Sequence, residues 1–323
     1  MLRFFITMII LLSITEAREY LVSWNSSKSK SNIVEFVTKT TDAKGSYFIP
    51  KADRVVVFDN DGTLWSEKPM YFQLYFILDR VKKLANNHPE WKSKEPFKSV
   101  LDGNMTKVLS FGEKGLIELS SATQSGMSVP EYQEIVRKWI KEAKHPRFNR
   151  PYSELIYQPM MELITYLEAN DFKVYIVSGG GIDFMRAFIP ALYDIPTEQI
   201  IGSSGVIKYV DGKIIKEPKI NFIDDKDTKP VAINYHIGKR PVASFGNSDG
   251  DLAMMKYSEA GRGERLQLYV HHTDKKREWS YDRDSHVGKL DKGLDYAKDK
   301  GWTIVDMQKD WRVVYPFELD KNR

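Results

Sequence analysis

The stretch RVVVFDNDGTLW, residues 54–65, constrains the fold of this chain more than any other segment. Its apolar start predicts a strand over 54–58, of the kind that a parallel sheet covers on both faces. The strand leads directly into Asp59 and Asp61, two carboxylates so close in sequence that their charges repel each other. A cation and an electrophile placed between them would make the pair tolerable, so this loop is the first candidate for a functional site.

The same pattern of an apolar run followed by polar residues returns later in the chain. We expect strands over 174–177, 241–245 and 266–270, a helix over 182–192, and a hairpin that turns at Asp211-Gly212. Strands that alternate with helices predict an α/β fold with a doubly wound parallel sheet. Ligands bind such sheets beyond the carboxyl ends of the strands, where the loops 59–61, 178–179 and 247–251 would meet.

The chain between the first two strands has a different character. Apolar residues recur at helical spacing over 71–84, 129–143 and 159–167, and no convincing strand occurs there. We therefore expect an all-helical cap over 67–170, inserted into a core domain formed by 51–66 and 171–323. Residues 18–50 are expected to form a polar surface lead-in to the core.

The N-terminus predicts export. MLRFFITMIILLSITEARE has Arg3 before a short apolar run, and Thr15 and Ala17 stand at the −3 and −1 positions of a cleavage site. We expect a signal peptide over 1–17 and a secreted or periplasmic protein with no membrane segment in its mature form; an uncleaved anchor is the alternative. The chain has no cysteine, which excludes disulfides, thiol catalysis and zinc–thiolate sites.

The charge pattern does not indicate a nucleic-acid partner. The net charge of +4 comes from Lys and Arg scattered along the chain, and the short cluster 275–277 is typical of a solvated surface. His271 and His272 lack a third ligand at an obvious spacing, so they are interpreted as structural or surface residues.

The clustered polar residues suit phosphoryl transfer. An aspartate can attack phosphorus and form an aspartyl-phosphate, and a second acid two residues on can protonate the leaving oxygen and then activate water. Ser178 and the N–H groups of Gly179 and Gly180, placed at the start of a helix, could hold phosphate oxygens. Lys229, with Lys226 as its rival, could neutralise the developing charge. Asp249 and Asp251 would complete a Mg²⁺ site.

In order along the chain, DNDGT (59–63), the serine of VYIVSGG, Lys229 and GNSDGD (246–251) resemble the motifs of the haloacid dehalogenase (HAD) superfamily, in its phosphatase branch. The resemblance implies that Asp59 is the nucleophile and Asp61 the general acid/base. It also implies that the Asp59 carboxylate and the Asp61 main-chain carbonyl bind Mg²⁺, that Ser178 binds phosphate and that Lys229 is the motif lysine. Asn60 would contribute only its backbone, to substrate binding.

Two positions depart from the family pattern. The family usually has Asp where this chain has Asn247, so we expect metal ligands in the order Asn247, Asp251, Asp249. The helical cap resembles that of phosphoserine phosphatases, but their usual Glu falls where Lys68 stands, one residue after Glu67. The resemblance therefore implies a Mg²⁺-dependent phosphatase of small phosphomonoesters, with phosphoserine-like substrates as a minority option, and the N-terminus adds the expectation of export. A phosphotransferase or mutase, and a non-catalytic phosphate binder, are the alternatives.

Overall fold

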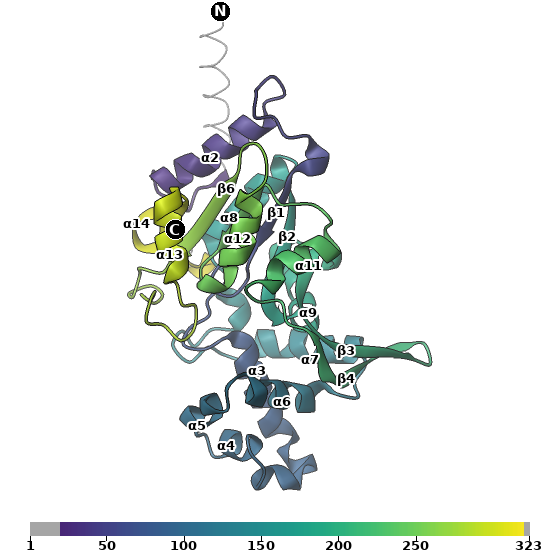
Figure 1. Cartoon of the computed structure of the whole chain (residues 1–323). Helices are drawn as coiled ribbons and strands as arrows, with labels where there is room; N and C mark the ends of the chain where they lie inside the picture. Colours follow the sequence, from purple (N-terminus) through teal and green to yellow (C-terminus); the bar gives the residue numbers. More distant parts are fainter. Residues whose placement is uncertain (1–19, 320–323) are drawn as a thin grey trace, which may run out of the picture.

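The computed structural model describes residues 20–319, and the predicted signal peptide lies outside this range. A seven-stranded sheet with the order β4-β3-β2-β1-β5-β6-β7 forms the centre of the molecule (Figure 1). All neighbouring strands pair in parallel except β3 and β4, which form an antiparallel hairpin. This sheet confirms the predicted fold class. Over residues 20–319, no helix is long and apolar enough to cross a membrane.

The elements follow one another with these bounds: α2 (Lys28–Thr41), β1 (Val55–Phe58), α3 (Phe72–Leu84), α4 (Phe97–Leu101), α5 (Met105–Ser110), α6 (Gly112–Gln124), α7 (Val129–Glu142), α8 (Gln158–Ala169), β2 (Lys173–Gly181), α9 (Ile182–Arg186), α10 (Ile189–Tyr193), β3 (Ile200–Val210), β4 (Lys213–Phe222), α11 (Thr228–His236), β5 (Ala243–Gly246), α12 (Leu252–Glu259), β6 (Leu266–His271), α13 (Lys292–Lys300), β7 (Thr303–Asp306) and α14 (Met307–Asp310).

Helices cover both faces of the central strands. Alternate residues of β1 belong to different clusters: Val56 and Phe58 pack with α2 and α8, whereas Val55 and Val57 pack with α11 and α12. Because side chains of a strand alternate between its faces, a strand covered on both sides must be apolar throughout. All four residues of β1 are indeed buried.

The segment 18–50 is more than a surface lead-in, and that prediction is wrong. Residues 28–41 form α2, whose Ile33, Phe36 and Val37 are buried in the main core. Their spacing places them on one side of the helix, which therefore packs into the core. The predicted helix over 182–192 is divided into α9 and α10, and residues 303–306, for which no strand was predicted, form the edge strand β7.

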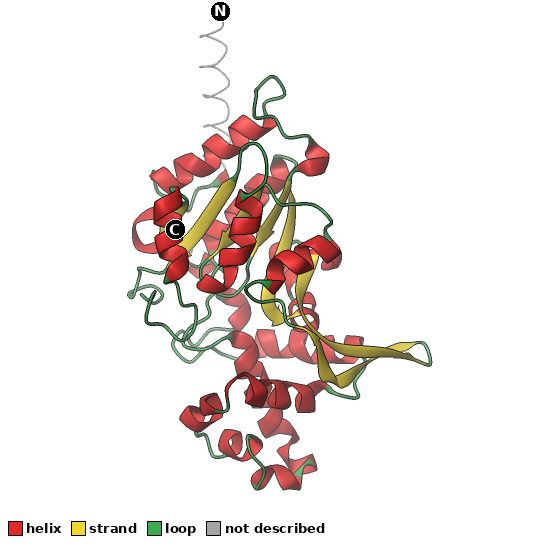
Figure 2. Cartoon of the chain, in the orientation of Figure 1, coloured by secondary structure: helices red, strands yellow, loops and turns green. Residues whose placement is uncertain are grey.

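Between β1 and β2 the described chain forms helices and no strand of the sheet. Helices α3 to α7 lie at the lower end of the molecule in Figures 1 and 2, beyond the carboxyl end of β1, where the β3–β4 hairpin projects alongside α6 and α7. The turn of the hairpin falls at Asp211-Gly212, as predicted. The cap boundaries 67–170 stay a prediction; α8 packs on β2, so we propose that it belongs with the core.

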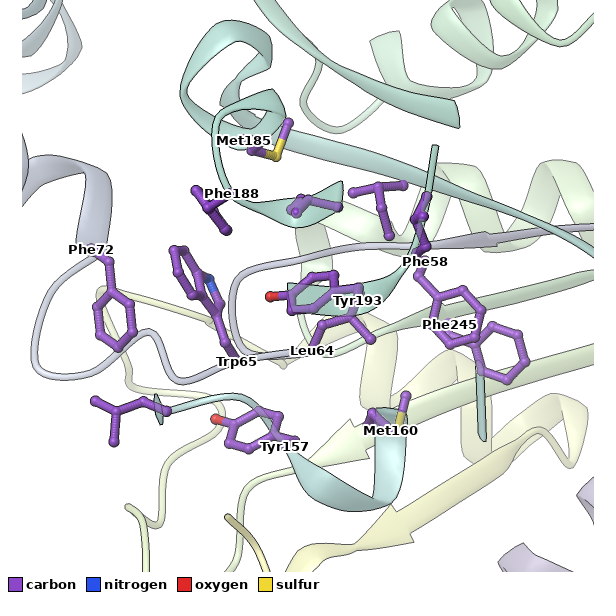
Figure 3. Packing of buried hydrophobic residues seen from close by; sticks show 14 of the residues in the cluster. Phe58, Leu64, Trp65, Phe72, Tyr157, Met160, Met185, Phe188, Tyr193 and Phe245 are labelled. Carbon is purple, nitrogen blue, oxygen red and sulfur yellow. The ribbon is translucent and has the colours of Figure 1, made fainter. Parts of the chain in front are cut away.

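Aromatic packing stabilises the strand ends that carry the polar loops (Figure 3). The rings of Phe58 and Phe245, the former at the end of β1 and the latter within β5, stack with centroids 4.1 Å apart. Trp65 stacks on Phe188 at 4.7 Å, which joins the loop after β1 to the α9–α10 segment. These contacts hold three sequence-distant segments at one edge of the sheet.

Candidate active site

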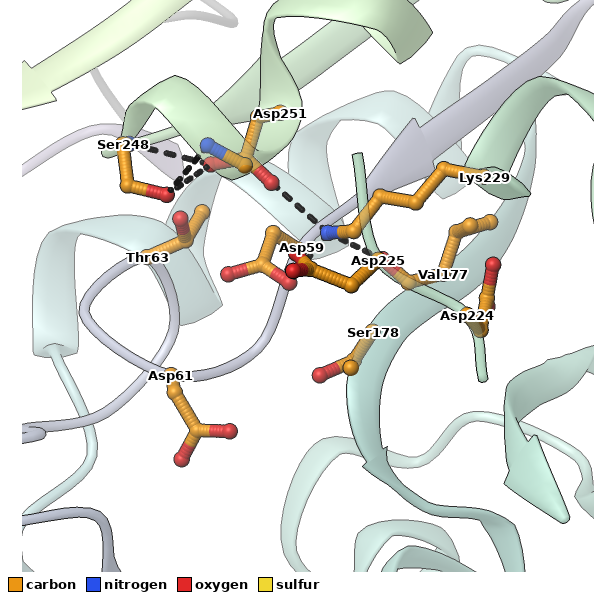
Figure 4. Close-up of polar contacts among 12 residues, drawn as sticks. Asp59, Asp61, Thr63, Val177, Ser178, Asp224, Asp225, Lys229, Ser248 and Asp251 are labelled. Atoms are coloured by element: carbon orange, nitrogen blue, oxygen red, sulfur yellow. Dashed lines mark hydrogen bonds and ion pairs between the residues drawn. The ribbon is translucent and has the colours of Figure 1, made fainter. Parts of the chain in front are cut away.

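Asp59 and Asp61 lie in the loop that follows β1, at the carboxyl edge of the sheet (Figure 4). The Asp59 amide donates to the carbonyl of Phe245 at 2.9 Å, so the sheet itself positions this residue. Gly62 has φ +74°, and a Cβ at that position would come within 2.1 Å of Asn247 Nδ2. Only glycine combines this backbone conformation with such a close approach, which explains the glycine of the DNDGT motif.

Lys229 joins Asp59 to Asp251. Its Nζ donates to Asp59 Oδ1 at 2.6 Å, to Asp251 Oδ1 at 2.7 Å and to the Val177 carbonyl at 2.9 Å (Figure 4). Burial alone would lower the pKa of Lys229, but the charges of Asp251 and Asp59 raise it above its ordinary value, so the ammonium stays charged. Lys226 is exposed and lies 3.6 Å from Asp225. Lys229 is therefore the lysine of the site.

The carboxylate of Asp251 is fully engaged. Its Oδ2 accepts from the backbone amides of Asn247 and Ser248, each at 3.0 Å, and from the Ser248 hydroxyl at 3.2 Å. Its Oδ1 accepts from Lys229. Asp251 therefore orders the loop 247–251 and orients the lysine. Because both of its oxygens already accept hydrogen bonds, Asp251 has fewer lone pairs for a metal ion than its position in the sequence indicates.

Asn247 is buried and held on both sides of its amide group. Nδ2 donates to Glu67 Oε1 at 2.7 Å, and Oδ1 accepts from the Thr63 hydroxyl at 3.2 Å. Glu67 also accepts from the hydroxyl of Tyr281 at 2.7 Å. Burial raises the pKa of Glu67 well above its usual range. The amide oxygen of Asn247 retains a second lone pair, which leaves it available as a ligand.

The structure does not bring Asp249 to the site. Its carboxylate accepts from the backbone amides of Asp291, Lys292 and Gly293 at 2.8 to 3.3 Å, at the start of α13. Negative charge is stabilised there by the helix dipole. Asp249 thus serves α13; its role as a metal ligand stays a prediction, which these hydrogen bonds do not support.

Ser178 lies at the carboxyl end of β2, next to Asp59 in Figure 4. The two glycines after it continue the strand, and helix α9 begins only at Ile182, so the prediction that Gly179 and Gly180 open a helix is wrong. The Gly180 amide donates to Ser178 Oγ at 3.2 Å. Whether Ser178, Gly179 and Gly180 bind phosphate stays a prediction.

Asp61 differs from Asp59 in its surroundings. Its Oδ1 accepts from the indole Nε1 of Trp65 at 2.8 Å, and Figure 4 shows its carboxylate apart from the group around Lys229. Burial raises the pKa of Asp61 to about 6, partly opposed by the hydrogen bond from Trp65. A carboxyl group with that pKa can hold or release a proton near neutral pH, as a general acid/base requires.

The side chain of Asn60 turns to the protein interior. Its Oδ1 accepts from the Tyr193 hydroxyl at 3.0 Å, and its carbonyl accepts from the amide of Leu64 at 2.8 Å. The carbonyl thus stabilises the turn that shapes the loop, and the expectation that the Asn60 backbone binds substrate stays a prediction. His272, also interpreted as structural, is buried with Nε2 2.8 Å from the Gly62 carbonyl.

Asp224 is a residue that the sequence did not single out. Its side chain is buried after the end of β4, and neither carboxylate oxygen has a hydrogen-bond partner among the described residues. Burial raises its pKa to about 7, and the charge of Lys229 opposes the rise. No motif marks the position, because only the fold of the hairpin brings it close to Lys229.

The residues present fit a magnesium ion. Over residues 20–319 there is no cluster of three acidic or histidine side chains suited to a metal, so a site here needs other oxygen donors. Asp59 Oδ2 accepts no hydrogen bond from the described chain, and the Asn247 amide oxygen and a main-chain carbonyl at Asp61 supply the hard, uncharged oxygens that Mg²⁺ accepts.

Comparison with known proteins identifies the family to which the chain is similar. Residues 56–256, more than half of the chain, match the family described as haloacid dehalogenase-like hydrolase. No curated protein sequence matches. A solved structure of a conserved functionally unknown protein from Anaerococcus prevotii DSM 20548 is 18% identical, covering 79% of this chain and 88% of that one at a TM-score of 0.49.

Two further solved structures are similar at the same low level. A protein with unknown function from Bordetella pertussis Tohama I is 14% identical, covering 79% of this chain and 98% of that one, with a TM-score of 0.48. A phosphoserine phosphohydrolase-like protein from Francisella tularensis subsp. tularensis SCHU S4 is 16% identical, covering 83% and 99%, with a TM-score of 0.41. The assignment of family therefore rests on the match over residues 56–256.

Proposed function

The chain belongs to the haloacid dehalogenase-like hydrolases, and from this premise we propose that it is a Mg²⁺-dependent phosphatase of small phosphomonoesters that acts through an aspartyl-phosphate on Asp59. The observation that carries the proposal is the contrast between the two acids after β1. Lys229 forms an ion pair with Asp59 at 2.6 Å, whereas Asp61 forms no ion pair among the described residues and accepts from the Trp65 indole. Burial raises the pKa of both carboxyl groups, that of Asp61 to about 6, and only Asp59 has the charge of Lys229 directly beside it. One acid is suited to attack and the other to proton transfer.

The reaction needs two steps. An oxygen of Asp59 attacks phosphorus, the bond from phosphorus to the ester oxygen breaks, and Asp61 gives its proton to the departing alcohol. Asp61 then removes a proton from water, the water oxygen attacks phosphorus, and the bond to Asp59 breaks to release inorganic phosphate and the free carboxylate. The same group thus acts first as acid and then as base, which a pKa near 6 permits.

The remaining catalysis comes from positioning the phosphate group and neutralising the charges around it. Lys229 neutralises Asp59 and is itself fixed by Asp251, and Ser178 lies where it can donate to a phosphate oxygen. Asp59, the main-chain carbonyl of Asp61 and the Asn247 amide oxygen would hold Mg²⁺, which when bound supplies positive charge against the phosphate oxygens.

The surroundings of Glu67 support the proposed substrate class. In this chain the Glu67 carboxyl group bonds to Asn247 and Tyr281, both at 2.7 Å. A carboxylate used in this way is not free to bind an ammonium group of a substrate, which supports small phosphomonoesters in general over phosphoserine. The N-terminal sequence supports export, so we propose that hydrolysis takes place outside the cytoplasm.

The test is a screen of phosphomonoesters with Mg²⁺ or with EDTA, using the wild type, Asp59→Asn and Asp211→Asn. Asp59→Asn removes the nucleophile and should lower turnover by orders of magnitude, because the covalent route is lost. Asp211 lies exposed at the hairpin turn, where Asn is equally suited, so this variant should match the wild type.

Four results would overturn the proposal. Wild-type activity in Asp59→Asn would exclude the aspartyl-phosphate, and full activity in EDTA would exclude the metal. Transfer to an added alcohol in preference to water would show a phosphotransferase. An absence of turnover with every ester at saturating Mg²⁺ would show a phosphate binder without catalysis.

A further inference from the structure

A cavity lies at the edge of the sheet opposite to the active site. It has a volume of about 490 Å³ and is lined by the segment that precedes β1 and by residues that immediately precede β5 and β6. In Figure 1 the segment before β1 lies at the upper end of the sheet, away from helices α3 to α7. The four residues of β1 separate the two edges by about 13 Å. The cavity is thus distinct from the site around Asp59.

Its lining is strongly cationic. Four of the residues carry positive charge, namely Lys239, Arg240, Arg262 and Arg265, against one acid, Asp53. Asp53 is already bound to Lys239 at 2.7 Å. None of the three arginines forms an ion pair with an acidic residue in the part of the chain that the structure describes. The arginines therefore bring together like charges that no protein carboxylate compensates.

Arg265 shows the imbalance most clearly. Its guanidinium packs on Gly261, where a Cβ would come within 2.5 Å of Nε. The Nε atom is buried without a hydrogen-bond partner among the described residues, which is rare for a group of this kind. Burial, and then the neighbouring charge of Arg240, lower the pKa of Arg265 from its ordinary value. An anion in the cavity would offset the repulsion between Arg265 and Arg240.

The other arginines are arranged to receive such an anion. Arg240 is fixed by stacking on Tyr257, with its guanidinium 4.0 Å from the ring centroid, and Arg262 is exposed at the rim. Tyr47 and Phe48 line the same cavity and expose 48% and 40% of their surface, so flat apolar groups lie beside the cations. Guanidinium groups match the geometry of phosphate oxygens, and a cavity of several hundred Å³ accepts a small organic ligand.

We propose that this cavity is a second ligand site, which binds the phosphate group of a small molecule through Arg240, Arg262 and Arg265, with Tyr47 and Phe48 against the organic part. The ligand class is a phosphate monoester that bears a flat ring, and inorganic phosphate shares the anionic half of this chemistry. Binding here is independent of hydrolysis at Asp59.

The experiment is calorimetric titration of the full chain carrying Asp59→Asn, in EDTA and about 150 mM NaCl, a salt concentration that screens exposed charges beyond about 8 Å. The probes are adenosine 5′-monophosphate, inorganic phosphate and adenosine. Arg265→Gln and Arg262→Gln are compared with Lys138→Gln, which removes one exposed charge from α7. Arg262 is exposed, so its variant tests the site even if Arg265→Gln disturbs the fold.

We expect the monophosphate to bind at least about tenfold more tightly than inorganic phosphate, with little binding of adenosine. Arg262→Gln and Arg265→Gln should each weaken the monophosphate at least about tenfold, Lys138→Gln should not, and both arginine variants in an otherwise wild-type chain should keep the wild-type turnover. Equal binding by all variants, or adenosine binding as tightly as its monophosphate, would overturn the proposal. A loss in Lys138→Gln as large as that in the arginine variants would show unspecific charge attraction and overturn it too.

Discussion

The side-chain amide of Asn247 donates a hydrogen bond of 2.7 Å to the carboxyl group of Glu67, and both groups are buried. This bond turns Nδ2 of Asn247 toward Glu67 and leaves the amide oxygen facing Thr63. Asn247, the uncharged residue in the loop 247–251, thus pairs with an acid from a distant part of the chain, Glu67. An aspartate at this position would place a second acid against the buried carboxyl group of Glu67.

Asn247→Asp should therefore have two opposite effects. The added charge should lower the Mg²⁺ concentration for half-maximal activity by about tenfold, equivalent to about 1.4 kcal/mol. Without Mg²⁺ it should lower the free energy of unfolding, because two carboxyl groups at 2.7 Å cannot both ionise. Activity against metal concentration and urea denaturation in EDTA measure the two effects.

The double variant Asn247→Asp, Glu67→Gln supplies the control for this pair. The side-chain amide introduced at position 67 would donate to the new carboxylate, so the loss of stability should be largely restored. Asn221→Asp, on the hairpin, introduces the same charge elsewhere and should change neither quantity. A weaker apparent affinity for Mg²⁺ in Asn247→Asp would exclude Asn247 as a ligand.

The pH dependence should report Asp61. Its pKa of about 6 means that the acid form, which protonates the leaving group, declines as the pH rises through 6. We expect kcat/KM for an alkyl phosphate to fall about tenfold per pH unit above that value. An ester with a leaving group of low pKa needs no proton, so its kcat/KM should not fall in this way as the pH rises above 6. Identical profiles for the two esters would contradict the role of Asp61 as acid.

Asp224 should make stability depend on pH. Its pKa is about 7 in the folded protein and about 3.9 when unfolded, so folding takes up a proton between these values. This contribution favours the folded state below about pH 4 and is lost as the pH rises to 7. Asp224→Asn should be more stable than the wild type by up to about 4 kcal/mol at pH 8 and by little at pH 4.

Urea denaturation at the two pH values measures this difference. Asp225→Asn is the matched control, because the Asp225 side chain is 42% exposed and its neutralisation should give no comparable gain. A gain for Asp224→Asn that is the same at pH 4 and pH 8 would show that the buried charge is not its cause.

Substitution of Asp249 and substitution of Asp251 should have different effects, although only one residue lies between them. Asp249→Ala removes the acceptor of three amides at α13 and should lower the free energy of unfolding by about 1 kcal/mol, with the Mg²⁺ dependence of activity unchanged. Asp251→Ala frees Lys229 and the loop 247–251, so turnover itself should be lost. A raised Mg²⁺ requirement in Asp249→Ala would return Asp249 to the metal site.

The sequence predicted the sheet because its signals are local. An uninterrupted apolar run such as VVVF indicates a strand buried on both faces, and Asp211-Gly212 indicates a hairpin turn, without any knowledge of distant residues. The order of polar residues after the strands then brought Asp59, Lys229 and Asp251 together correctly.

The contacts that sequence reasoning missed depend on tertiary packing. Asp249 is a plausible ligand by spacing, but α13, more than forty residues later, takes its carboxylate. Lys226 and Lys229 are equivalent in sequence; Lys226 precedes α11, whereas Lys229 lies in its first turn and points inward. Asp224 carries no local signal, because its burial comes from the path of the chain after β4.

The parallel pairing of β1 with its two neighbours has a consequence for how the protein acquires its site. Val55 pairs with Lys173 on one side, and Val56 pairs with Ala243 on the other, so both contacts close very long loops. Contacts of this kind form slowly, because much chain entropy is lost before they are stabilised. We expect the centre of the sheet to assemble late, and the catalytic groups to become functional in that same final event. A partly folded chain would then hold its helices while remaining unable to react.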